Sequence, residues 1–343
     1  MDCSAVGTCR QTSRCASLLF AVLLLSLSAC TSIQVALGLK MRLDKVPVAG
    51  LSVTLTPGPA IAPGSKARLV IVANSSDGET YVTEGAGHGN VAFDSFTFDA
   101  SLVQVDSDGV ATLPADPRIS QGKLPHVRIM TNGHPDVVGN LDIPLRYDVQ
   151  YHASFSGASG NSGFDGTNGL DGMSGMSGSM DPNSPSPGGD GTDGGPGGDG
   201  DDGGPGSPGE AVQISVNLLA GPSPLLQARV ASRSREQLYL IDPNGGSLSV
   251  ESNGGAGGRG GSGGRGGRGG SGGIGSPNGR DGMDGRSGSD GRPGPAGAAG
   301  TFTVAIDPSA SQYLDRLHLT NKDGYGGAGP RPDIHVEPVG PLW

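Results

Sequence analysis

The chain has 343 residues and a formal net charge of −10, with 64 glycines, 34% hydrophobic residues and 4% aromatic residues. This length allows two or three domains, but so few apolar and aromatic residues exclude one large conventional core. The acidic balance argues against a basic surface for nucleic acid, so we expect no nucleic-acid partner.

Residues 1–29 have the features of an export signal. Arg10 and Arg14 precede an apolar run at 16–25, which is too short to span a bilayer. The run leads into Leu27-Ser28-Ala29-Cys30, which resembles the lipobox of bacterial lipoproteins. The resemblance implies cleavage before Cys30, attachment of lipid to its thiol and acylation of its new amine. An ordinary signal peptide with a chance cysteine is the alternative.

The lipobox also predicts where the protein resides. Thr31 follows the cysteine in place of the aspartate associated with inner-membrane retention, so we expect an outer-membrane lipoprotein facing the periplasm or the cell surface. All four cysteines lie within the first thirty residues. The mature chain would therefore have one acylated cysteine, which excludes disulfides, thiolate metal sites and cysteine nucleophiles. Without Asp2, Arg10 and Arg14 the net charge becomes about −11.

We expect residues 30–48 to form the lipidated N-terminus and a tether, with 33–39 as a candidate first strand. Residues 49–156 then alternate short apolar runs with turn-forming sequences. The expected strands lie at 51–56, 67–73, 93–98, 103–105, 127–130 and 141–151, and the last strand, at 146–155, leads directly into a glycine-rich run. Short strands with frequent turns over about a hundred residues predict an immunoglobulin-like β-sandwich.

Four runs with glycine at every third position dominate the rest of the chain. We call them the first, second, third and fourth arms; they cover residues 157–178, 188–209, 254–275 and 279–300. Each arm has 22 residues and eight in-phase glycines, and short turn-rich connectors join the arms in pairs. A period of three is that of polyproline II, and a glycine face lets another backbone approach closely. We therefore predict two polyproline II hairpins, at 157–209 and 254–300.

The arms differ in their non-glycine positions. The first arm has one mostly apolar face and one polar face, so we expect it to pack on one side. The third arm repeats Gly-Gly-x, which suits an interior position. The second arm is rich in aspartate and the third in arginine, which suggests that these two arms are neighbours. This organisation is similar to glycine-rich polyglycine II folds found in some antifreeze and adhesin proteins.

Two alternatives remain for the arms. Triplets such as those at 291–300 resemble bacterial collagen-like proteins, which implies a homotrimer. The 88 arm residues contain only five prolines, however, far below the roughly 15–20% expected of a collagen. The arms could instead be flexible Gly/Ser linkers, which need neither strict phase nor equal length. We favour a monomer with an intrachain bundle.

The segments 210–253 and 301–343 are expected to be β-structure that carries both hairpins. Strands are predicted at 212–216, 225–230, 237–241, 247–251, 302–306 and 313–319. The sequence Asp242-Pro-Asn-Gly-Gly246 predicts a hairpin turn. Because each segment is too short for a safe core of its own, we expect the two to form one small sheet. The fold class is thus all-β.

Few residues suggest chemistry. A Gly-x-Gly-x-x-Gly match at 255–260 is automatic in such a repeat and lacks a strand–helix context. The acidic cluster of the second arm contains the candidate calcium ligands Asp190, Asp193, Asp199, Asp201 and Asp202, with a solvated acidic face as the alternative. The six histidines, at positions 88, 126, 134, 152, 318 and 335, show no metal-binding spacing. We expect no enzyme and no cofactor.

The expected function is therefore non-catalytic: a lipid-anchored envelope protein with a structural or adhesive role. The alternatives are a homotrimeric collagen-like matrix protein and a calcium- or polysaccharide-binding surface module. The expected partners are the membrane, through the lipid anchor, and a polysaccharide or a protein surface.

Overall fold

The computed structural model describes residues 35, 40–83 and 89–343, which divide into two compact units at Tyr147/Asp148. Strands dominate both units, which confirms the all-β class. The export signal, Cys30, His88 and nearly all of the candidate strand at 33–39 lie outside the described residues. Among the described residues, no helix has the length and apolar character needed to cross a membrane.

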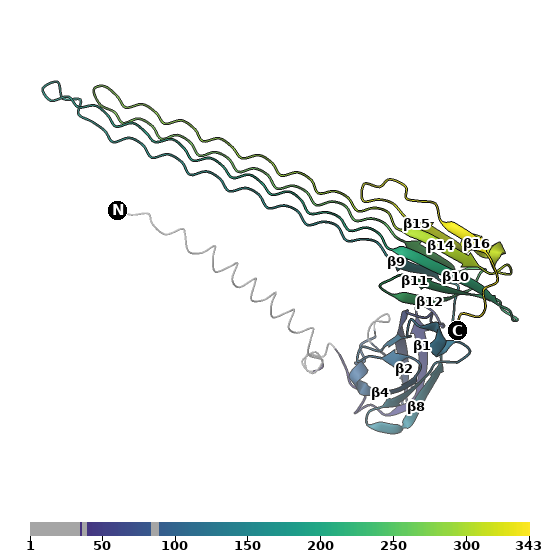
Figure 1. Ribbon diagram of the computed structural model, residues 1–343. Helices are drawn as coiled ribbons and strands as arrows, with labels where there is room; N and C mark the ends of the chain where they lie inside the picture. The colour runs from purple at the N-terminus through teal and green to yellow at the C-terminus, as the bar shows by residue number, and fades with distance from the viewer. Residues whose placement is uncertain (1–34, 36–39, 84–88) are drawn as a thin grey trace. The chain divides into compact units, whose positions relative to one another are not determined.

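The first unit contains two sheets (Figure 1). One has the order β1-β2-β6-β5, with β3 also paired to β2, and the other has the order β4-β7-β8. The strands are β1 (Val48–Thr56), β2 (Lys66–Ser75), β3 (Thr80–Val82), β4 (Phe96–Ser101), β5 (Gln104–Val105), β6 (Val110–Thr112), β7 (His126–Thr131) and β8 (His134–Asp142). All the pairings between them are antiparallel.

Both sheets of the first unit contribute to one core. Leu69 and Ile71 of β2 pack in the same buried cluster as Phe96 of β4 and Ile129 of β7. On β2 the buried residues alternate with less buried ones, as expected for a strand with one face on a core. The helix α3 (Pro117–Ser120) begins with proline at its first position, and the Asp116 side chain accepts from the Arg118 N–H.

Several boundaries in the first unit differ from the sequence prediction. The strands β3 and β6 were not predicted, since each has only three residues. Phe93–Ser95 forms the 3₁₀ helix η1 instead of beginning a strand. The expected strand at 141–151 is wrong, because β8 ends at Asp142, whereas the last strand, expected at 146–155, is present as the shorter β9 (Gln150–Ser154). The β9 strand belongs to the second unit, although the sequence grouped it with the preceding β-sandwich, because its pairing partner lies about a hundred residues later.

The second unit also has two sheets. The larger has the order β12-β11-β10-β14-β16, and the smaller has the order β15-β13-β9. The strands after β9 are β10 (Ala211–Leu219), β11 (Leu225–Ala231), β12 (Glu236–Ile241), β13 (Ser247–Glu251), β14 (Thr301–Ile306), β15 (Leu317–Thr320) and β16 (Asp333–Val336). One core joins the sheets: Val212 and Val304 of the larger sheet cluster with Leu248 and Val250 of the smaller.

The prediction of one small sheet for residues 210–253 and 301–343 is therefore wrong, and so is the predicted hairpin at 242–246. Asp242 does form a turn, in which its carbonyl accepts the Gly246 N–H. However, β12 before the turn and β13 after it belong to different sheets. Crossing between sheets lets the buried faces of both strands contact a shared core.

The expected strand at 313–319 is also corrected. Ser311–Arg316 forms the 3₁₀ helix η2, and only the following residues form β15. A turn at Asp307 precedes η2, with the Asp307 carbonyl accepting the Ala310 N–H at 2.9 Å. The strand β16, in the Pro/Gly-rich tail, was not predicted; its four residues are all exposed, and it pairs in parallel with β14.

Candidate functional site

The four glycine arms form a hydrogen-bonded bundle within one chain. In Figure 1 they run side by side away from the sheets of the second unit. The eight in-phase glycines of the first arm, from Gly157 to Gly178, donate their N–H groups to carbonyls of the third arm or of Asn253 just before it. The second arm runs antiparallel to the first and donates to it at every third residue, for example from Gly195 to Leu170.

The second and third arms lie at the centre of this bundle. The third arm donates to the second, and the in-phase glycines of the second arm donate to the fourth arm. The fourth arm in turn donates to the third, so the two central arms are bonded to each other and to both outer arms. The Gly-Gly-x repeat of the third arm explains this position, because two of its three faces are bare backbone against neighbours.

Close packing requires glycine at the in-phase positions. A Cβ atom added at Gly194 would lie closer than 3.0 Å to the Gly267 carbonyl, and one at Gly257 would lie equally close to the Gly294 carbonyl. Real Cβ atoms essentially never approach backbone so closely. At Gly195 the nearest atoms would be the Leu170 nitrogen at 3.2 Å and its oxygen at 3.4 Å, which is tight but not prohibitive.

Aspartate side chains add a second set of hydrogen bonds between the arms. Asp190, Asp193, Asp199 and Asp202 of the second arm each accept a backbone N–H from the fourth arm at 2.6–2.7 Å. The same role is taken by Asp165, Asn168 and Asp171 of the first arm and by Asp281, Asp284 and Asp290 of the fourth. Sequence analysis missed this role, although an acidic or amide residue recurring before glycine at one triplet position was its signal.

These bonds alter the interpretation of the acidic cluster. Four of the five candidate calcium ligands use a carboxylate oxygen to hold the neighbouring arm, and Asp201 bonds to the first and third arms through its backbone. Across the described residues, no group of three or more His, Cys, Asp or Glu side chains could hold a metal ion. Three of the described histidines each meet a single carboxylate: His126 contacts Asp142, His152 contacts Glu251 and His335 contacts Asp333.

The register of the sheets continues into the arms. Ser154 of β9 pairs with Glu251 of β13, and Asp165 of the first arm bonds to Ser262 of the third; the partners in both pairs are 97 positions apart. Ala211 of β10 pairs with Thr301 of β14 with an offset of 90, which is also the offset between Asp190 and Arg280. The parallel pairs β9–β13 and β10–β14 therefore set the register of the arms that adjoin them.

The junction between sheets and arms is tightly bonded. Ser252 is fully buried, and its hydroxyl donates to the Glu210 carbonyl at 2.6 Å. The Ser234 hydroxyl contacts both Glu210 carboxylate oxygens, at 2.8 and 2.9 Å. Hydrogen bonds from the Ser232 and Ser234 hydroxyls lower the pKa of Glu210 below its usual value. Ionised Glu210 therefore helps to fix the loop at 232–235 beside the base of the arms.

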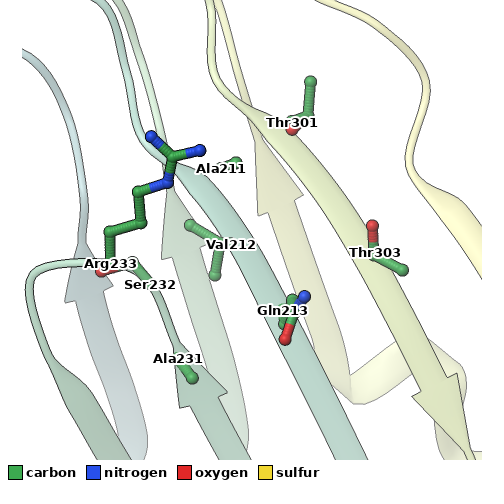
Figure 2. A pocket seen from close by; sticks show the side chains of 8 residues that line it. All are labelled: Ala211, Val212, Gln213, Ala231, Ser232, Arg233, Thr301 and Thr303. Carbon is green, nitrogen blue, oxygen red and sulfur yellow. The ribbon is translucent and has the colours of Figure 1, made fainter.

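A pocket of about 320 Å³ lies near this junction. Figure 2 shows the side chains that line it, from β10, β14, the end of β11 and the loop that follows β11. They are Ala211, Val212, Gln213, Ala231, Ser232, Arg233, Thr301 and Thr303. The exposed Arg233 guanidinium, a glutamine amide and the threonine hydroxyls offer hydrogen bonds to a polar ligand. We find no nucleophile paired with a base among these lining residues.

The outer surface of the first arm is apolar and exposed. Phe164, Leu170, Met173 and Met176 are 80%, 83%, 75% and 87% exposed. The sequence predicted that this face would pack on one side. Within the described chain these side chains remain exposed, because the first arm contacts its neighbours through its glycines, carbonyls and aspartates.

Comparison with protein-family models, with curated proteins and with solved structures finds no match for this chain. Its function must be argued from the geometry above.

Proposed function

We propose that this chain is a non-catalytic, lipid-anchored protein of the bacterial outer envelope, with a structural or adhesive role exerted through its glycine bundle. In this proposal Cys30 carries the lipid, the first unit is an immunoglobulin-like stalk, and the arms are polyproline II helices in two hairpins. Interarm hydrogen bonds at every third residue support the polyproline II assignment, since that helix has three residues per turn.

The proposal depends mainly on one observation: the arms of one chain form backbone hydrogen bonds with one another along their whole length. An arm that is bonded laterally at every third residue over its whole length is a rigid projection, and the side chains that do not bond to a neighbouring arm are displayed on its surface. This bonding favours an intrachain bundle over a collagen-like homotrimer, because the backbone groups that a trimer would need are already used. A polysaccharide or a protein surface is the partner class that suits such a display.

The test examines the lipid anchor and the adhesive role of the arms separately. The full chain is produced in a Gram-negative host and compared with Cys30→Ala and with a variant in which short linkers replace residues 157–209 and 254–300. We expect the full chain in the outer-membrane fraction and the Cys30→Ala variant in the soluble fraction. Cells with the linker variant should keep the protein in the membrane but lose attachment to polysaccharide- or protein-coated surfaces. Unchanged attachment by the linker variant would refute the adhesive role.

A further inference from the structure

The first and second arms together present a largely apolar face with a single charged residue. On the first arm the residues are Ala158, Asn161, Phe164, Thr167, Leu170, Met173 and Met176, and we call them the ridge. Facing them on the second arm are Gly189, Thr192, Gly195, Gly198, Asp201, Gly204 and Ser207, which we call the glycine row. Each residue of the row donates its N–H to the ridge residue at the same level.

Ridge and row have complementary shapes. Four large side chains project from the ridge, each at least 75% exposed. The row beside it has no side chain at four of its seven levels, so it is lower than the ridge and runs parallel to it. A single acidic residue, Asp201, is the only charge among the fourteen positions, whereas the fourth arm displays Arg280, Arg286 and Arg292.

We propose that this face binds a second copy of the chain, with the ridge of each copy seated on the glycine row of the other. This inference rests on the proposed function and specifies its partner. A two-fold axis parallel to the arms places ridge over row twice, giving the self-complementary contact of a homodimer. Leu170 then meets Gly195 of the second copy, and Met176 meets Gly189, because each pair lies at one level.

The available area suits a dimer. Four large apolar side chains at about 150 Å² each supply about 600 Å² per copy, or about 1,200 Å² for two copies before the row is counted. That sum reaches the lower range of specific interfaces, and an exposed apolar patch of this size on a soluble surface indicates an interaction site. With the axis along the arms, both bases lie at the same end, so the two copies could be anchored in one membrane.

The first test measures association. The chain from Thr31 onward keeps every described residue and both units, and its mass is measured by sedimentation over a concentration series. We expect a reversible dimer that Leu170→Ser with Met176→Ser weakens by about tenfold or more. The matched control is Met283→Ser, which alters an equally exposed methionine (73%) on the fourth arm and should leave the dimer unchanged. Circular dichroism melting verifies that the variants fold.

The second test measures orientation. Because all four cysteines precede Thr31, a cysteine introduced by Leu170→Cys or Gly195→Cys is unique in its chain. Oxidation should link chains in a mixture of the two variants and in neither variant alone. A monomer at all concentrations, equal weakening by Met283→Ser, or no link in the mixture would overturn the inference. A monomer with protease-resistant arms would leave the proposed function standing, whereas protease-sensitive arms would contradict both.

Discussion

At the scale of single residues, the bundle depends on the absence of side chains at defined positions. The in-phase glycines and the extra glycines of the third arm place backbone against backbone, and aspartates accept hydrogen bonds from several of the other N–H groups. Each aspartate hydrogen bond is partly exposed and stabilises the fold by only about 1 kcal/mol, so these bonds matter because there are many of them along the arms. A methyl group added at an in-phase glycine, in contrast, must displace a neighbouring arm.

Two adjacent glycines allow this requirement to be tested with one kind of substitution. Gly194→Ala directs its methyl group at the Gly267 carbonyl and should lower stability by about 1–3 kcal/mol, or about 2–12 °C in Tm. Gly195→Ala directs its methyl group along the surface past Leu170 and should change Tm much less. Thermal melting by circular dichroism measures both. Equal effects of the two substitutions would show that the arms do not pack as described.

At the scale of elements, the strands and the arms form one continuous register. The strands β9 and β13 lead into the first and third arms, while β10 and β14 receive the second and fourth. Ordering a glycine-rich arm costs much conformational entropy, so its first triplets are best fixed by a neighbouring strand pair whose core already exists. The equal length of the arms follows, because every triplet needs a partner at its own level.

Lengthening one arm alone should therefore damage the fold. Two extra Gly-Ser-Ser triplets inserted after Gly166 would shift the distal half of the first arm by six residues against the second and third arms. We expect a lower melting temperature and rapid cleavage of the arms by protease. Adding two triplets at the matching level of all four arms preserves every pairing and serves as the control. If the single insertion behaved like this control, the arms would be tethers rather than packed elements.

At the scale of the whole molecule, the two units have separate cores. The buried cluster of the first unit draws on residues from Leu43 to Ile143, and that of the second on residues from Ala153 to Leu317. All strands that hold the arms belong to the second unit. The bundle and its base thus form one cooperative structure, and the first unit contributes no strand to it.

Residues 148–343 should consequently fold alone. We expect this fragment to show one cooperative melting transition, at the temperature of the corresponding transition of the chain from Thr31 onward. Differential scanning calorimetry of the fragment, of residues 40–147 and of the longer chain provides the comparison. An unfolded fragment, or a transition moved by more than a few degrees, would mean that the second unit depends on the first.

The sequence alone determined the β class, the positions of most strands and the length and phase of the arms. These features are local, since turn residues, alternation and a period of three are visible within a short window. The Gly-Gly-x repeat even indicated that the third arm is interior. The lipobox at Cys30 also belongs to the sequence, and it remains a prediction.

Only the tertiary structure decided which segments pair. The strand β9 pairs with β13, which lies 97 positions later in the chain. The strands β12 and β13, which the sequence suggested as a hairpin, belong to different sheets. The aspartates of the second arm bond to the fourth arm. Such pairings are set by shared burial and by the register of distant backbone, which no local pattern encodes. For the same reason the apolar face of the first arm was recognised in the sequence, while its exposure beside the glycine row was not.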